Sequence, residues 1–191
     1  LGPEAVTDLD DPATARLAAG HSPARPAPAG GRDGDDVILV FSSGTTGMPK
    51  AVRHSHRSIG CATAHWCAAL GLGPDDRFQV ATPPSHILGL LNLLAAAAAG
   101  VTVRLHRRFD LDEVLARIAG ERMTLEMAVA PIALAMANHP SLEDYDLSSL
   151  FLLASTAALF STSIKEKFLE LLPNRVITDS IGSSETGFGG T

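Results

Sequence analysis

The sequence predicts an α/β fold with a layered, parallel-rich sheet and flanking helices. From Val37 onward, short β-prone runs alternate with helical patterns, which is the arrangement expected of parallel βαβ units. Hydrophobic residues make up 46% of the 191 positions, enough for one sizeable core or for two small cores that share a wall. We therefore expect a globular α/β unit that begins near Val37.

The expected strands and helices follow one another along this unit. The β-prone runs are residues 37–41, 78–80, 101–105, 124–128, 150–154 and 176–179. The helical patterns cover residues 58–70, 87–99, 111–119, 131–138 and 161–171. The helix at 111–119 has the clearest signal, because Asp110 and Glu113 form a capping-box-like pair around its apolar stripe.

The N-terminal part of the chain has a different composition. From Gly20 to Asp36 it reads GHSPARPAPAGGRDGDD, and a stretch so rich in Pro, Ala and Gly buries little apolar surface. We therefore expect residues 1–36 to be a linker or mobile segment and residues 37–191 to be the folded part.

Charge and cysteine content limit the partners, the cellular location and the metal sites that are expected for this protein. Fifteen basic and 21 acidic residues give a formal net charge of −6, so nucleic acid is not an expected partner. Cys61 and Cys67 are the only cysteines, and no secretory leader pattern opens the sequence, which favours a cytoplasmic location. Their spacing with His65 lacks the paired short intervals of zinc modules. Two buried thiols on one helix are expected instead.

The apolar run at residues 87–101, ILGLLNLLAAAAAGV, is the candidate for a membrane segment. It is shorter than the ~20 apolar residues that span a bilayer, and it contains Gly89 and Asn92. The sequence therefore predicts a buried helix here and no transmembrane segment.

The strongest chemical signal is VFSSGTTGMPKAV, residues 40–52, directly after an expected strand. A turn rich in glycine and hydroxyl side chains can point successive backbone N–H groups at an anion, and Lys50 would add positive charge. The segment is not a Walker loop, which requires Gly before the Lys and Ser or Thr after it. Pro49 and Ala51 occupy those positions. The composition suits a polyphosphate but disfavours a P-loop nucleoside triphosphatase.

Two further segments have the composition of a ligand site. IGSSETG, residues 181–187, follows the expected strand at 176–179, and PPSHILG, residues 83–89, precedes the apolar helix. Each has a simpler explanation by itself, because a capped turn accounts for the first and a structural His86 accounts for the second.

In this order, the segments resemble those of the adenylate-forming superfamily, in its acyl-CoA synthetase branch. The glycine-rich segment is similar to the family's phosphate-binding signature Thr-Ser-Gly-Thr-Thr-Gly-x-Pro-Lys-Gly, from which Ser42 and Ala51 depart mildly. The other two are similar to Tyr-Gly-x-Thr-Glu and to Pro-x-x-His-x-x-Gly. The resemblance covers roughly residues 37–190 and implies part of the family's large N-terminal domain.

The resemblance implies roles for individual residues. For catalysis it implies Lys50, His86 near the carboxylate to be activated, and Glu185 as the Mg²⁺ ligand. For nucleotide binding it implies Ser42, Ser43, Gly44, Thr45, Thr46, Gly47, Lys50, Ser155, Thr156, Ala157, Asp179, Ile181, Gly182 and Ser184. Ile181 replaces an aromatic residue that the family usually places beside adenine, which leaves the nucleotide affinity open.

The implied activity is that of an acyl-CoA synthetase. With ATP and Mg²⁺ such an enzyme activates a carboxylic acid, here expected to be a fatty acid, as an acyl adenylate and transfers it to CoA. The chain lacks the family's ribose-binding Asp and catalytic Lys, so by itself it is expected to be inactive. Two alternatives stay open: a non-catalytic nucleotide-binding or interaction module, and one chain of a split enzyme.

Simpler roles are expected for other residues. His54 and His56 follow the glycine-rich segment and could face phosphate, but an exposed helix start is the simpler expectation for both. Trp66 is expected to pack its helix against the sheet. Glu143, Asp144 and Asp146 lie in a polar stretch that predicts a solvated surface turn.

Overall fold

The computed structural model describes residues 16, 19–20, 30–42, 47–156, 158, 160–172 and 175–191. The chain divides into two compact units, residues 1–31 and 32–191, and every element described below belongs to the second. Most of the expected linker lies outside the described residues. The same holds for five expected site residues: Ser43, Gly44, Thr45, Thr46 and Ala157.

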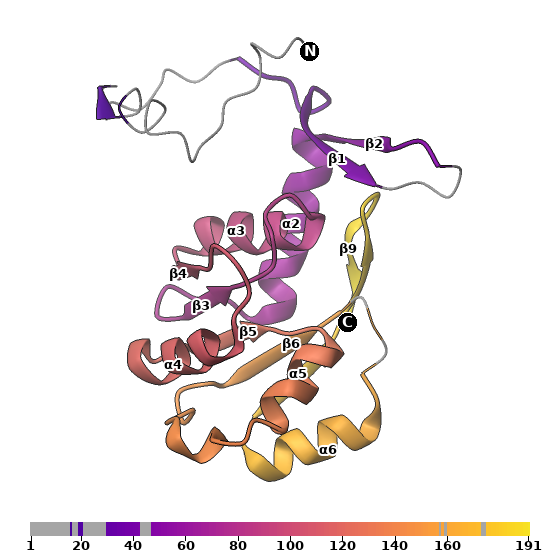
Figure 1. Ribbon diagram of the computed structural model, residues 1–191. Helices are drawn as coiled ribbons and strands as arrows, with labels where there is room; N and C mark the ends of the chain where they lie inside the picture. Colours follow the sequence, from indigo (N-terminus) through magenta and orange to yellow (C-terminus); the bar gives the residue numbers. More distant parts are fainter. Residues whose placement is uncertain are drawn as a thin grey trace. The chain divides into compact units, whose positions relative to one another are not determined.

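Within the described residues, a five-stranded parallel sheet forms the centre of the second unit (Figure 1). Its strands, in spatial order, are β4 (Thr102–Leu105), β3 (Arg77–Val80), β5 (Leu125–Met127), β6 (Leu152–Ser155) and β7 (Val176–Asp179). In register, Phe78 pairs with Val103 and Leu125, and Leu125 pairs with Leu152. This confirms the predicted α/β fold.

Helices cover both faces of the sheet. Their bounds are α2 (His56–Leu70), α3 (Ile87–Ala99), α4 (Leu111–Glu121), α5 (Ala130–Ala137) and α6 (Thr162–Leu171), with a short 3₁₀ helix η2 (Leu142–Asp144) after α5. Because side chains alternate along a strand, Leu152 packs with α2 and α3, whereas Leu153 packs with α4, α5 and α6. The sheet is thus the shared wall of two buried cores.

Local sequence defines the ends of α2 and α3. The Ser55 hydroxyl accepts the Ser58 N–H and the Ser58 hydroxyl accepts the Ser55 N–H, which forms a capping box. Gly71 and Gly100 end the two helices with φ of 64° and 73°, a left-handed conformation that favours glycine. Residues 95–99 of α3 are all alanine, the best helix former. The helix predicted at 87–99 is confirmed.

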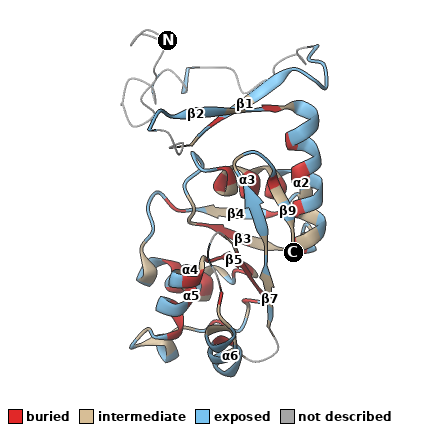
Figure 2. Cartoon of the chain, turned by 90° about the vertical axis from the view of Figure 1, so that its right-hand side faces the viewer, coloured by how far each residue is buried: buried red, intermediate tan, exposed pale blue. Residues whose placement is uncertain are grey.

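Two antiparallel hairpins extend from this layered core. The first pairs β1 (Asp36–Ser42) with β2 (Lys50–Ser55), and the second pairs β8 (Ile181–Ser183) with β9 (Gly187–Gly190). The strand predicted at 37–41 therefore exists, but it does not enter the parallel sheet. Figure 2 shows that much of the first hairpin is exposed, and Phe41 is 66% exposed.

One expectation about α2 is wrong. Cys61 is exposed and Cys67 is only half-buried, because at about 3.6 residues per turn the two positions fall on different faces of the helix. The buried face of α2 is formed instead by Ile59, Ala62 and Trp66. As to membrane segments, none of the helices in the described part of the chain is long and apolar enough to cross a bilayer.

Candidate functional site

A pocket of about 330 Å³ lies at the carboxyl ends of the parallel strands. Three of the pocket residues come after strands of this sheet. Thr156 directly follows β6, Ser180 directly follows β7, and His86 ends the loop that follows β3. The chain leaves β3 for β4 on one side and returns to β5 on the other, and open α/β sheets bind ligands at the carboxyl edge beside such a switch. The fold alone therefore indicates a ligand site here.

Gly89 lets the loop before α3 pack directly on the helix. A Cβ atom at this position would lie 2.3 Å from the Pro83 carbonyl oxygen and 2.6 Å from that of Thr82, closer than atoms of this kind approach. The Pro-x-x-His-x-x-Gly spacing therefore has a structural reason, because only glycine at its end allows the loop to place His86 at the start of α3.

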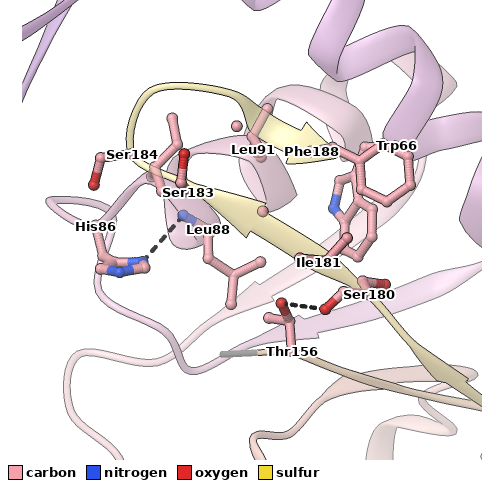
Figure 3. Close-up of a pocket in the computed structure, with 13 residues that line it drawn as sticks. Trp66, His86, Leu88, Leu91, Thr156, Ser180, Ile181, Ser183, Ser184 and Phe188 are labelled. Atoms are coloured by element: carbon pink, nitrogen blue, oxygen red, sulfur yellow. Dashed lines mark hydrogen bonds between the residues drawn. The ribbon is translucent and has the colours of Figure 1, made fainter. Parts of the chain in front are cut away.

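His86 caps α3 and also lines the pocket (Figure 3). Its Nδ1 accepts the Leu88 backbone N–H at 3.1 Å. Since Nδ1 is an acceptor, the neutral ring carries its proton on Nε2. One ring nitrogen thus serves the structural role expected of this histidine, and in this tautomer the other nitrogen, Nε2, carries an N–H group.

His54 joins the two hairpins. Its Nε2 lies 2.7 Å from the carbonyl oxygen of Ser184, and because a carbonyl can only accept, Nε2 donates. His54 is 2% exposed and lies in β2 opposite Ile38. The expectation of an exposed helix start is therefore wrong: the helix begins two residues later, and the strand turns this ring inward.

Glu185 lies exposed in the turn between β8 and β9. Its carboxyl pKa is lowered first by a hydrogen bond from its own backbone N–H and then by the Ser183 hydroxyl, with smaller electrostatic effects from Lys50 and His54. Glu185 is therefore ionised at neutral pH. Lys50 and Glu185 are distant in sequence, but the fold brings them within electrostatic range of each other.

The remaining expected site residues lie in several places. Thr156, Ile181, Gly182 and Ser184 line the pocket with His86, and the Thr156 hydroxyl donates to the Ser180 carbonyl at 2.8 Å (Figure 3). Asp179 pairs with Lys165 and lines a neighbouring hollow. Ser155 is fully buried. Ser42, Gly47 and Lys50 lie on the first hairpin or its loop, outside the pocket lining.

The sequence motifs missed the apolar part of the pocket. Trp66, Leu91 and Phe188 line it, although they belong to α2, α3 and β9. Trp66 is buried in the core beside the sheet, as expected, and it also contacts Phe188 with ring centroids 5.0 Å apart. No local pattern marks such residues, because their only common property is the cavity that they share.

The side chains near Glu185 are suited to one kind of metal. Among the described residues, no group of three or more His, Cys, Asp or Glu side chains could hold a metal ion. Mg²⁺ does not need such a group, since it is held by one or two carboxylates together with waters and substrate phosphates. The exposed carboxylate of Glu185, with the Ser183 and Thr186 hydroxyls 3.2 Å apart in the same turn, fits this requirement.

Comparison with known proteins identifies the family. Residues 3–191 match the family model described as AMP-binding enzyme. The chain is 44% identical over 183 residues to the medium/long-chain-fatty-acid–CoA/3-oxocholest-4-en-26-oate–CoA ligase of Mycolicibacterium smegmatis, a match that covers 85% of this chain and 33% of the relative. It is 35% identical over 189 residues to the 3-oxocholest-4-en-26-oate–CoA ligase of Rhodococcus rhodochrous, a match that covers 83% of this chain and 33% of that relative.

A solved structure agrees on the fold. The N-terminal domain of FACL13 from Mycobacterium tuberculosis superposes with a TM-score of 0.83 at 24% identity, over 93% of this chain and 44% of that chain. The chain belongs to the AMP-binding enzyme family, as the three motifs predicted. It spans about a third of the length of the curated relatives that it matches.

Proposed function

We propose that this chain forms the nucleotide-binding and acid-binding part of an ATP-dependent acyl-CoA synthetase. One observation carries the proposal: His54 joins the hairpin that bears Lys50 to Ser184 in the turn that bears Glu185, and Ser184 lines the pocket together with His86. The chain's similarity to curated fatty-acid–CoA ligases supports it. In this proposal residues 37–191 are part of the AMP-binding domain, residues 1–36 are the linker, and the full-length protein is cytoplasmic.

The proposed first step is the attack of a substrate carboxylate on the α-phosphate of ATP, with release of pyrophosphate. His86 Nε2–H would hold the carboxylate at the pocket mouth, and Lys50 with the backbone around Gly47 would bind the departing phosphates. Glu185 would hold Mg²⁺, which when bound neutralises phosphate charge. Ser184 and Thr156 would line the nucleotide side, together with Ser42, Ser43, Gly44, Thr45, Thr46, Ser155, Ala157, Asp179, Ile181 and Gly182. In the second step the CoA thiol would displace AMP from the acyl adenylate.

The test is carboxylate-dependent exchange of pyrophosphate into ATP by the full-length protein, followed by an assay for the acyl-CoA thioester. We expect exchange with apolar carboxylic acids and none when the acid is omitted. Nucleotide binding without exchange, for any acid tested, would instead identify a non-catalytic nucleotide-binding module.

A change at Lys50 tests the phosphate-binding role of the first hairpin. Lys50→Ala in the full-length protein is expected to lower kcat/KM for MgATP roughly 10- to 100-fold, because a positive charge beside the phosphates is lost. The melting temperature should not change, since exposed charges contribute little to stability. Lys167→Ala removes an exposed lysine of α6 and is the matched control. Unchanged nucleotide kinetics in Lys50→Ala would remove Lys50 from the site.

A change at His54 tests whether the contact between the hairpins positions the site. His54→Ala removes the hydrogen-bond donor to the Ser184 carbonyl. We expect it to lower kcat more than it raises KM for the acid, because the turn that bears Glu185 is no longer held in position relative to Lys50. His54→Asn, which keeps an N–H donor, should restore part of kcat. His56→Ala, at the exposed start of α2, is the control. Equal kcat in His54→Ala and wild type would contradict this role.

A further inference from the structure

The pocket has a polar side and an aromatic side. Figure 3 shows His86 and Ser184 on one side, Trp66 and Phe188 on the other, and Leu88 and Leu91 between them. A carboxylic acid held at His86 therefore extends its apolar part toward Trp66. The side chains at that end then decide how much acyl group fits.

Trp66 is fixed in place at this end. The ring is 1% exposed, and its Nε1–H donates to the Oδ1 of Asn92 at 2.9 Å. Asn92 is itself completely buried in α3. If the indole turned away to lengthen the pocket, it would leave a buried donor and a buried acceptor without partners, which is costly in an apolar core. The hydrogen bond therefore holds the indole as a rigid wall.

Phe188 and the backbone of β9 support this wall from the other direction. The Phe188 ring lies against Trp66, with centroids 5.0 Å apart and planes inclined by 45°, a favourable aromatic arrangement. Directly before it, Gly187 has a φ of 66°, and a Cβ there would lie 3.1 Å from the Ala62 Cβ and 3.2 Å from the Leu91 Cδ1. The second hairpin is therefore packed tightly on α2 and α3, which leaves no empty space into which the aromatic side chains of the pocket could move.

We infer that Trp66, anchored by Asn92 and backed by Phe188, sets the maximum length of the acyl group that this pocket accepts. The inference rests on the proposed acyl-CoA synthetase function and adds a specificity-determining element to it. An acyl chain that passes the limit must displace the indole and break the Trp66–Asn92 hydrogen bond, whereas a shorter chain fits without any change.

The experiment measures kcat/KM of the full-length protein for straight-chain saturated acids of increasing length. Phe188→Ala removes a half-buried ring that lines the pocket and supports the indole, so it enlarges the aromatic end, and Trp66→Phe shortens the wall itself. Both are expected to move the optimum to longer acids, with a gain of roughly 10-fold or more for the first acid beyond the wild-type limit. Activity with acids below the limit should persist, which distinguishes a change of specificity from general damage. Phe151→Ala truncates a phenylalanine that is 57% exposed and distant from the pocket, and it should leave the optimum unchanged.

The outcomes separate this inference from the proposed function. Exchange in the wild type with the same length optimum in wild type and Phe188→Ala would overturn the inference and leave the function intact. Absence of exchange with every acid would overturn the function, and the inference with it. If Trp66→Phe fails to fold, Phe188→Ala still tests the inference. Its effect on folding is expected to be smaller, because the Phe188 side chain lies at the surface of the core rather than inside it.

Discussion

Replacement of Glu185 by glutamine in the full-length protein is expected to slow adenylation by roughly 100-fold or more and to raise the Mg²⁺ concentration that activity requires. The carboxylate is fully exposed and ionised, so its charge is available to a metal ion that arrives with the nucleotide. Glutamine keeps the size and the local hydrogen bonds of the turn but removes this charge. The melting temperature should therefore stay that of the wild type.

The measurements are a melting curve and a Mg²⁺ titration of activity on the same variant. Glu170→Gln neutralises an exposed acid of α6 and is the matched control, for which both readouts should equal those of the wild type. A Glu185→Gln protein that melts at a lower temperature yet titrates normally with Mg²⁺ would make Glu185 a turn residue and exclude it from metal binding.

Stability should depend on pH through a second acid, the buried Glu126 of β5. Its side chain is 1% exposed, its Oε2 accepts the Gln79 Nε2–H at 2.7 Å, and its Oε1 has no partner among the described residues. The same Gln79 amide accepts from His106 Nε2 and donates to the Val114 carbonyl, which fixes its orientation. Burial raises the pKa of Glu126 from 4.5 to about 8.

The direction of the effect follows from proton binding. Between pH 4.5 and about 8 the folded chain keeps a proton on Glu126 that the unfolded chain has lost, so the free energy of unfolding falls as pH rises through this window. The full effect is on the order of 3 to 5 kcal/mol. Glu126→Gln cannot ionise and should lose this pH dependence, so it gains stability relative to wild type as pH rises.

Unfolding of wild type and Glu126→Gln, followed from about pH 5 to about pH 9, measures this difference directly. Because both proteins keep His106, whose pKa burial lowers, the comparison isolates Glu126. An exposed control, Glu170→Gln, should give a curve parallel to that of the wild type. Parallel curves for Glu126→Gln as well would mean that Glu126 keeps an ordinary pKa in the folded protein.

Local sequence signals were sufficient for several elements. The helix at 87–99 has the predicted bounds because a capping side chain, an alanine-rich body and a left-handed glycine all act within one or two turns. The strands of the parallel sheet were predicted within a few residues, because each is a short run with large apolar or β-branched side chains between two helical patterns. By contrast β2, β8 and β9 were missed: strands such as GFGG owe their existence to a cross-strand partner rather than to their own side chains.

The sequence by itself determined the α/β class, the family and the motif residues around His86, Ile181 and Ser184, because each depends on residues close together in the chain. Only the tertiary structure placed Trp66 and Phe188 at the end of the pocket, buried His54 against Ser184 and isolated Glu126 from water. These features depend on which strand pairs with which and on which face a helix covers. Desolvation and cavity shape arise from such distant contacts, and no short stretch of sequence contains them.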